Sequence, residues 1–275
     1  MTEAAALASA RLMGRGDVKA TDRAGAEAMH RTFQSIGIDG TVVISEGEAV
    51  EQGVLTIGDR VGNGTGPKLD VALDPLEGAA ICATGGYNAL SIVALAEPGG
   101  FLRCPETHMD KLAVGPEGRG VIDLSKSATE NLRTLAEVRD VYVADLTVAI
   151  LDRPRHEKLI AEVRKAGARV RLLTDGDVAA ALATTRPESG IDALLGIGGA
   201  RQGILAAAGM KCAGGEILVR LRPRNDAEKE QARELGINDF DRVYSSDELV
   251  SGSVMVAGTG VTNGDYLKGV RFSRG

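Results

Sequence analysis

The feature that most constrains the fold is a regular alternation of strand and helix patterns that begins near residue 146. Short segments rich in Val, Ile and Leu occupy residues 147–151, 169–173 and 193–197 and are expected to form strands. Helical segments are expected at residues 154–166, 177–183 and 200–211. Because such alternation favours a parallel sheet covered by helices, the sequence predicts an α/β lobe from residue 146 to the end of the chain.

The first 145 residues are expected to form a separate lobe of helices and strands. Helices are predicted at residues 3–13, 22–34 and 130–139, and strands at residues 41–44, 69–73 and 88–96. In the second lobe, a helix at 226–234 and a strand at 254–257 follow the alternating region. Acidic residues follow two of the first-lobe strands, and loops at strand ends are where enzymes often place their chemistry.

Composition excludes several classes of function. The formal net charge of -6, the 3% aromatic content and the absence of Trp disfavour a nucleic-acid partner. The three cysteines, Cys82, Cys104 and Cys212, form no CxxC pair, so reduced thiols and a cytoplasmic location are expected. The acidic N-terminus and the lack of an apolar run near ~18 residues predict neither export nor membrane insertion.

The stretch Asp74-Pro75-Leu76-Glu77-Gly78 carries the strongest chemical signal. It places two carboxylates and a glycine at the end of an apolar strand, and Asp22 and Glu46 are further acids near element ends. Carboxylate oxygens suit Mg or Mn, and paired cations support hydrolysis of a phosphate ester. Amides that follow Gly78 at a helix start are suited to holding a phosphate.

Polar residues also end three successive strands of the second lobe. Arg153 and Arg155 follow the first strand and suit a second phosphate group. Asp175 and Asp177 follow the next strand and are suited to accept hydrogen bonds from sugar hydroxyls, and Gly199 lies at the end of the third. Together they predict a ligand-binding rim.

Structural interpretations remain open for most of these residues. Asp22, taken alone, is better explained as the N-cap or first-turn acid of the helix at 22–34, a role worth about 1 kcal/mol. Asp175 and Asp177 equally suit the start of a helix, and Arg153 and Arg155 equally suit a solvated lobe edge.

Several strings in the right order resemble class II fructose-1,6-bisphosphatase, over about residues 4 to 272. They are residues 13–17, 38–44, 74–78, 109–116, 152–156 and 175–180. The resemblance implies a layered α-β-α-β-α sandwich of the inositol-monophosphatase type, dependence on Mg or Mn, and hydrolysis of the 1-phosphate of a ketose bisphosphate. A cytoplasmic homo-oligomer of carbohydrate metabolism is expected.

The resemblance also assigns residues by position. It implies metal ligands at Asp22, Glu46, Asp74 and Glu77, with Asp74 and Glu77 also catalytic. It implies a substrate shell at Gly78, Ala79, His108, Arg153, Arg155, Asp175, Asp177 and Gly199.

The departures from the family pattern gather at positions that carry chemistry. Gln202 replaces a metal-binding glutamate, Ala79 a threonine that helps to hold the attacking water, and His108 a tyrosine that contacts substrate. Val18 replaces a lysine and Val50 an aspartate. The final strand segment of the family, after residues 269–271, is expected to be lacking.

Three interpretations of these departures follow. Since the loss of one catalytic group commonly costs 10² to 10⁴ in rate, hydrolysis is expected to be weakened or redirected to another sugar phosphate. The alternatives are a non-catalytic sugar-phosphate-binding or regulatory subunit and a repurposed enzyme of specialised metabolism.

Overall fold

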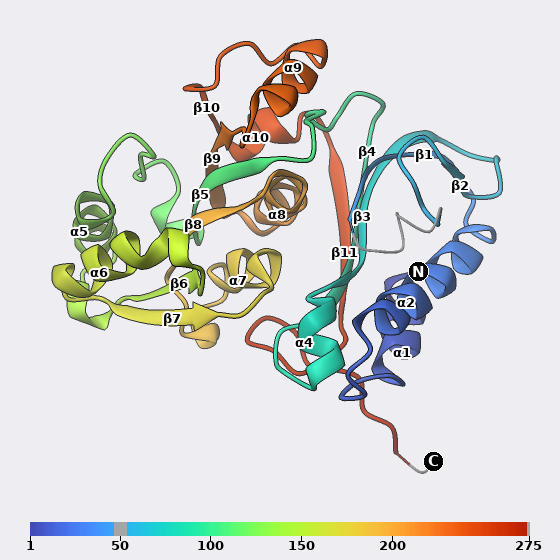
Figure 1. Cartoon of the computed structure of the whole chain (residues 1–275), viewed down its shortest axis with the longest axis horizontal. Coiled ribbons are helices and arrows are strands. Elements are labelled where there is room, and N and C mark those ends of the chain that lie inside the picture. Colours follow the sequence, from blue (N-terminus) through green and yellow to red (C-terminus); the bar gives the residue numbers. More distant parts are fainter. Residues whose placement is uncertain (47–53, 274–275) are drawn as a thin grey trace. The chain divides into compact units, whose positions relative to one another are not determined.

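The computed structural model describes residues 1–46 and 54–273, and the chain divides into two compact units (Figure 1). The first unit is Met1–Phe101 with Ser251–Gly275, and the second is Leu102–Val250. Each unit is built on one mixed β-sheet with helices packed against it. The mixed α/β class predicted from the sequence is therefore confirmed.

The sheet of the first unit has the order β11-β4-β3-β1-β2. Its strands are β1 (Asp39–Ser45), β2 (Arg60–Val61), β3 (Lys68–Glu77), β4 (Leu90–Ala96) and β11 (Val254–Gly260). The central pair β1 and β3 is parallel, whereas β4 runs antiparallel to both β3 and β11. The two long strands that carry the acidic residues therefore end at the same edge of this sheet.

Helices α1 (Thr2–Ala10) and α2 (Val18–Phe33) pack against each other and against this sheet. Met29 and Phe33 lie four residues apart on α2, so they share one helix face, and both are fully buried in a core with Val71 and Leu73 of β3. A short helix, α4 (Ala79–Thr84), follows β3 directly.

The sheet of the second unit has the order β10-β9-β5-β8-β6-β7. Its strands are β5 (His108–Val114), β6 (Thr147–Leu151), β7 (Arg169–Leu173), β8 (Ala193–Gly199), β9 (Glu216–Arg222) and β10 (Val243–Tyr244). Strand β6 pairs in parallel with β7 and β8, whereas β5 pairs antiparallel with β8 and β9. The expected parallel sheet is therefore correct only for β6, β7 and β8.

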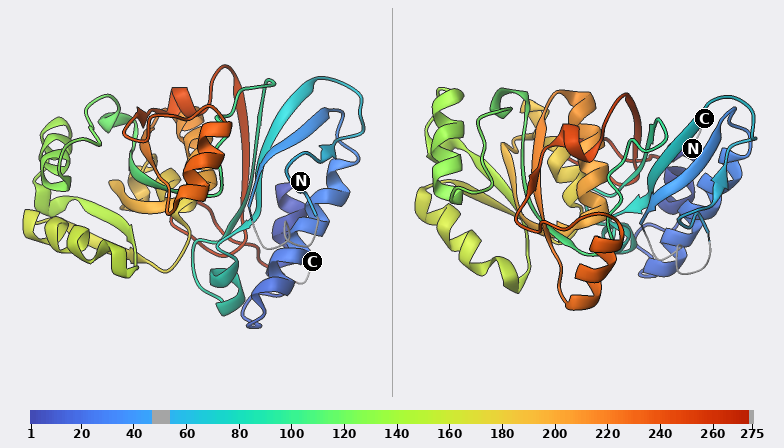
Figure 2. Two further views of the ribbon diagram at one scale, coloured as in Figure 1. Left: turned by 45° about the horizontal axis from the view of Figure 1, so that its top comes forward. Right: turned by 90° about the horizontal axis from the view of Figure 1, so that it is seen from above.

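Helices cover this second sheet on both faces (Figure 2). The helices are α5 (Ala128–Val138), α6 (Glu157–Ala166), α7 (Asp177–Ala183), α8 (Ala200–Ala213), α9 (Asp226–Glu234) and α10 (Ser246–Leu249), with single 3₁₀ turns at η1 (Pro116–Gly118), η2 (Val143–Asp145), η3 (Pro154–His156) and η4 (Pro187–Ser189). Leu112 and Val114 of β5 pack into the core beneath α5 and α6. Met109 and Lys111, which alternate with them, approach Gly203 of α8 on the other face.

The division into units differs from the expected boundary near residue 145, which falls inside the second unit between η2 and β6. The physical reason is strand pairing. Strand β5 precedes that boundary but hydrogen-bonds to β8 and β9, and β11 follows it but hydrogen-bonds to β4. Across residues 1–46 and 54–273, no helix combines the length and the apolar character needed to cross a membrane.

Candidate functional site

Glu46 and Asp74 are neighbours at the edge of the first sheet. In the parallel pairing of β1 with β3, Ser45 lies opposite Leu73, and the Glu46 N–H donates to the Leu73 carbonyl oxygen at 3.2 Å. The residues that follow this pair, Glu46 after Ser45 and Asp74 after Leu73, are therefore adjacent acids at the ends of the two strands. Gly47, Glu48 and Val50, which follow in the acidic loop, lie outside the described residues.

A β-bulge brings Asp74 and Glu77 to the same face of the sheet. Residues three apart on a regular strand point to opposite faces. Here Asp74 pairs with Ile92 and Glu77 pairs with Leu90, so β3 carries one residue more than β4 between these pairs. Because Ile92 and Leu90 are two residues apart, their partners Asp74 and Glu77 share a face.

The bulge has two local causes. Pro75 lacks the N–H that a regular ladder requires, so a proline at this point is compatible with a bulge. The Leu76 N–H donates to Asp74 Oδ1 at 3.0 Å, which satisfies the displaced backbone group and fixes the carboxylate.

Asp22 is not a helix cap, contrary to the interpretation favoured for it alone. Helix α2 begins at Val18, and its N-cap is Asp17, whose Oδ1 accepts a hydrogen bond from the Ala20 N–H at 2.9 Å. Asp22 lies one turn further along and is fully buried. Gly25, on the same face, approaches β3 so closely that an added Cβ would lie 3.3 Å from the Pro75 carbonyl oxygen. Thus α2 carries Asp22 toward the Asp74–Glu77 end of β3.

The four acids expected as metal ligands have the oxygen chemistry that a hard divalent cation prefers, but not the close spacing of a formed metal site. The carboxylates of Asp22, Asp74 and Glu77 are at most 4% exposed, and Glu46 is half-buried. Buried carboxylates need compensating charge or hydrogen bonds, and oxygen-only ligands suit Mg or Mn. Within residues 1–46 and 54–273, no group of three or more His, Cys, Asp or Glu side chains is arranged closely enough to hold a metal ion.

Gly78 and Ala79 form the turn from β3 into α4. Gly78 has a φ of 80°, a left-handed conformation that favours glycine, and an added Cβ would lie 3.2 Å from Ile81 Cδ1. Ala79 is half-buried and packs against an apolar cluster that includes Ile81 and Val261. A methyl group therefore occupies the position where the family pattern has a hydroxyl.

The substrate residues expected in the second unit gather at one edge of its sheet. The carboxyl ends of the parallel strands β6, β7 and β8 lead to Arg153, Asp175 and Gly199, respectively. Strand β5 begins at this edge, where His108 pairs with Gly199. The three strand ends therefore lie at one edge of this sheet, and ligand binding at this rim stays a prediction.

Both arginines of the rim are held by main-chain carbonyls. Arg153 Nη2 donates to Thr174 O at 2.8 Å, which ties the end of β6 to the end of β7. Arg155 Nη2 donates to Ile197 O at 2.8 Å, which ties η3 to β8. These contacts orient both guanidiniums, while Arg153 is half-buried and Arg155 is exposed, so a phosphate-binding role and a solvated lobe edge both remain open.

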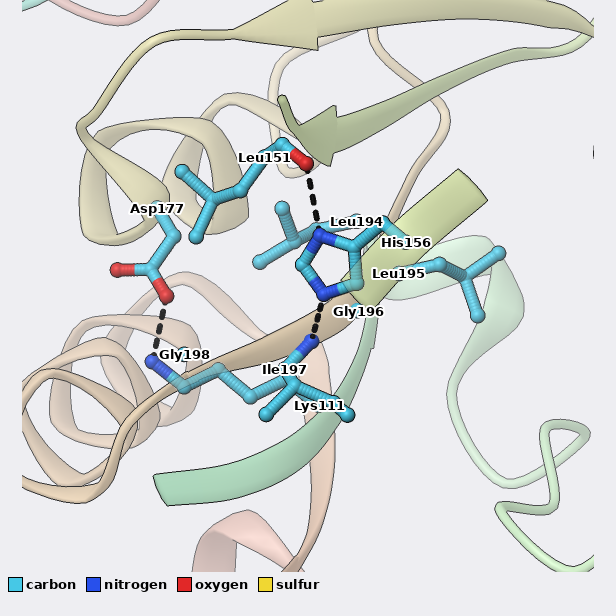
Figure 3. A pocket seen from close by; sticks show the side chains of 9 residues that line it. All are labelled: Lys111, Leu151, His156, Asp177, Leu194, Leu195, Gly196, Ile197 and Gly198. Atoms are coloured by element: carbon cyan, nitrogen blue, oxygen red, sulfur yellow. Dashed lines mark hydrogen bonds and ion pairs between the residues drawn. The ribbon is translucent and has the colours of Figure 1, made fainter. Parts of the chain in front are cut away.

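A small pocket beneath this rim contains two residues that sequence reasoning did not single out, Lys111 and His156 (Figure 3). Lys111 Nζ donates to Asp177 Oδ2 at 2.6 Å, and both side chains are buried. His156 Nδ1 lies 2.7 Å from Leu151 O, and His156 Nε2 accepts the Ile197 N–H at 2.8 Å. A ring that donates through Nδ1 and accepts through Nε2 is a neutral imidazole.

The sequence contained only an indirect signal for these two residues. Lys111 and His156 lie within strings 109–116 and 152–156, which carried the family resemblance. Nothing in the spacing of Lys111 and Asp177, which are 66 residues apart, indicates that they meet.

Burial and positive charge shift several pKa values at the rim. Burial raises the pKa of Asp175, and the Gly176 N–H, which donates to its carboxylate at 3.0 Å, opposes that shift. Burial lowers the pKa of His108, and Arg155 lowers it further. The pKa of Arg155 is itself lowered by burial and by Arg153. His108 therefore favours its neutral form beside this cationic group.

Gln202 lies on the first turn of α8, directly above the end of β8. Its side-chain amide occupies the space that a Cβ at Gly199 would enter, so a larger residue at position 199 would require the Gln202 amide to move. Six of the residues assigned by resemblance thus belong to the first unit and six to the second.

Comparison with known proteins gives one consistent result. A family model described as bacterial fructose-1,6-bisphosphatase, glpX-encoded, matches residues 1–275. The D-fructose 1,6-bisphosphatase class 2/sedoheptulose 1,7-bisphosphatase of Synechococcus elongatus is 41% identical over 303 residues, which cover 100% of this chain and 87% of that protein. The protein of the same name from Synechococcus sp. strain JA-3-3Ab is 40% identical over 300 residues, covering 100% and 86%.

Proposed function

Since the chain belongs to the family of bacterial, glpX-encoded fructose-1,6-bisphosphatases, we propose that it is a divalent-metal-dependent sugar-phosphate phosphatase with weakened or redirected hydrolysis. The observation that carries this proposal is the bulge that sets Asp74 and Glu77 on one face of the sheet, with Glu46 in the neighbouring strand register. This geometry sets two of the acids expected from the family pattern on one face, while Ala79 and Gln202 depart from that pattern.

In this proposal, Asp22, Glu46, Asp74 and Glu77 hold the metal. When bound, the metal supplies charge to the phosphate oxygens and lowers the pKa of a water molecule. Asp74 is held in place by the Leu76 N–H, so its carboxylate meets a ligand in a fixed orientation. The assay, rather than the donor set, distinguishes Mg from Mn, since both prefer oxygen ligands.

The substrate is a ketose bisphosphate or a related sugar phosphate. Arg153 and Arg155, fixed by main-chain carbonyls, pair with a phosphate group, and two guanidiniums at one edge favour a doubly charged ligand. Asp175 and Asp177 accept hydrogen bonds from sugar hydroxyls. The relatives' names include fructose 1,6-bisphosphate and sedoheptulose 1,7-bisphosphate, which are therefore the first substrates to test.

The two departures act on the chemical step. A glutamine at position 202 retains an oxygen donor but removes a negative charge, which weakens the hold on a cation. Alanine at position 79 has no hydroxyl to orient water. Each change is expected to cost about 10² to 10³ in rate, and effects within one site need not multiply.

The test is a phosphate-release screen over a panel of sugar phosphates with Mg or Mn. Slow turnover of fructose 1,6-bisphosphate, or faster turnover of another sugar phosphate, is expected. Glu77→Gln should abolish turnover, whereas Gln202→Glu with Ala79→Thr should raise the fructose 1,6-bisphosphate rate by at least tenfold. Unmodified turnover within the ordinary range of about 1 to 10³ s⁻¹ would contradict weakened hydrolysis.

The same screen separates the alternatives. Binding of sugar phosphates without any turnover, even in the double variant, would identify a non-catalytic binding subunit. The resemblance also supports a cytoplasmic homo-oligomer, which sedimentation of the purified chain would test.

A further inference from the structure

A cavity of about 250 Å³ lies at the opposite edge of the second sheet from the Arg153–Asp177 rim. Its walls include Pro116 of η1, Leu135 and Arg139 from the end of α5, Thr185 after α7, and Asp192 immediately before β8. Gly199, at the rim, is separated from Asp192 by the whole of β8. At a rise of about 3.3 Å per residue, the cavity and the rim are roughly 20 Å apart, so this cavity is separate from the candidate active site.

Arg139 is the charged centre of the cavity and has two very different carboxylate partners. On the inner side, its Nη1 pairs with Asp192 Oδ1, and Asp192 Oδ2 accepts the Thr147 N–H at 2.6 Å, so this carboxylate is fixed from both sides. On the outer side, Arg139 Nε lies 3.0 Å from Oε2 of Glu117, whose side chain is 65% exposed. Exposed pairs of this kind contribute little, typically about 0 to 1 kcal/mol. Glu117 is therefore a partner that another anion can replace.

The remaining walls are suited to a small organic body. Leu135 and Ile191 are almost fully buried and, with Pro116 and Pro187, provide apolar surface. The Thr185 hydroxyl donates to Leu182 O at 2.7 Å, so its lone pairs remain as acceptors toward a ligand. The cavity is smaller than the ~300 to 1,000 Å³ of drug-sized sites, which limits the ligand to a small molecule.

We propose that this cavity binds a small organic carboxylate that carries a hydrogen-bond donor, with the carboxylate displacing Glu117 from Arg139. The guanidinium presents its planar fork to carboxylate oxygens. Asp192 keeps Arg139 oriented during the exchange, and one anion replaces another, so the net charge of the cavity does not change. The apolar body of the ligand packs on Leu135 and Ile191.

4-Hydroxybenzoate is a suitable probe because it combines a carboxylate, a small apolar ring and a hydroxyl donor. Ligand-observed NMR and calorimetric titration of the full chain should give a Kd of about 1 mM, typical of such a small ligand. Uncharged 4-hydroxybenzamide should bind at least tenfold more weakly. Inorganic phosphate at 10 mM, which would compete at the Arg153–Arg155 edge, should not displace the probe.

Two variants of the same ion pair should have opposite effects. Arg139→Gln should weaken binding at least tenfold, whereas Glu117→Gln, which removes the competing carboxylate, should tighten it by up to about fivefold. Arg133→Gln is the matched control, because Arg133 is an exposed arginine of α5 outside the cavity lining.

The proposal is overturned by equal binding to Arg139→Gln, by weaker binding to Glu117→Gln, or by the absence of binding to the unmodified chain at 10 mM probe. Because Glu117 is exposed, Glu117→Gln should fold, and the direction of its change in probe affinity tests the proposal even where Arg139→Gln fails to fold. Displacement by phosphate that is equally strong in Arg139→Gln would assign the probe to the rim and would also overturn the proposal.

Discussion

Removal of the Lys111 charge should destabilise the second unit strongly. Lys111 Nζ lies 2.6 Å from Asp177 Oδ2, and the two side chains are only 3% and 9% exposed. Lys111→Met keeps the apolar stem but leaves the Asp177 carboxylate buried beside β8 without its cation. Breaking one side of a buried ion pair costs about 3 to 5 kcal/mol. At roughly 2 to 4 °C per kcal/mol for a unit of this size, the melting temperature should fall by about 6 to 20 °C.

A double-mutant cycle isolates the pair from other effects of the substitution. Urea unfolding is measured for the unmodified chain, Lys111→Met, Asp177→Asn and the double variant. The double variant should recover part of the loss, since no unpaired charge remains, with a coupling of at least about 2 kcal/mol. Lys158→Met, at an exposed lysine of α6, should change stability by less than about 0.5 kcal/mol. A coupling below about 0.5 kcal/mol would refute the reasoning.

Two further predictions follow from titrating groups. Burial lowers the pKa of His156 in the folded chain, so stability should be constant above the usual histidine pKa of about 6.5 and fall as the pH drops from there toward the lower folded value. His156→Gln should flatten this dependence in urea titrations, measured in a His108→Gln background because the pKa of His108 is lowered too. Burial raises the pKa of the Cys82 thiol to about 11, so in native protein at pH 7.5 exposed Cys212 should react with a disulfide reagent while Cys82 should not. Cys212→Ser should remove the fast reaction, and a fast reaction that persists through Cys82 would contradict the burial argument.

Local patterns were sufficient to predict the elements of the second unit that follow regular periods. Strands β6 and β7 and helix α7 have the predicted bounds, because the strand segments are rich in Val, Ile and Leu and a glycine precedes the helix. The rim at the carboxyl ends of these strands then follows from topology, since parallel neighbours end at one edge.

Strands β5 and β9 could not be predicted in the same way. Strand β5 carries Asp110 and Lys111 side by side, and charged residues in a central strand contradict the usual apolar run. In the structure, both charged side chains form ion pairs with residues that are distant in sequence. Arg220 and Arg222 of β9 pair with Asp110, and Asp177 pairs with Lys111. Because these long-range contacts cannot be inferred from local sequence patterns, the lobe boundary was predicted after β5, whereas the structure places the division before it.

The spacing of Asp74 and Glu77 shows what a motif conveys beyond its residue types. On a regular strand, residues with this spacing point to opposite faces of the sheet. From the sequence, only the family resemblance therefore assigned both carboxylates to one site. The bulge at Pro75 and Leu76 reconciles the motif with a single site, because the extra residue restores a common face. This backbone feature does not depend on the residues at positions 79 and 202. A chain that retains the bulge can therefore keep Asp74 and Glu77 on one face whatever residues stand at positions 79 and 202, and for this reason metal binding and turnover must be measured separately.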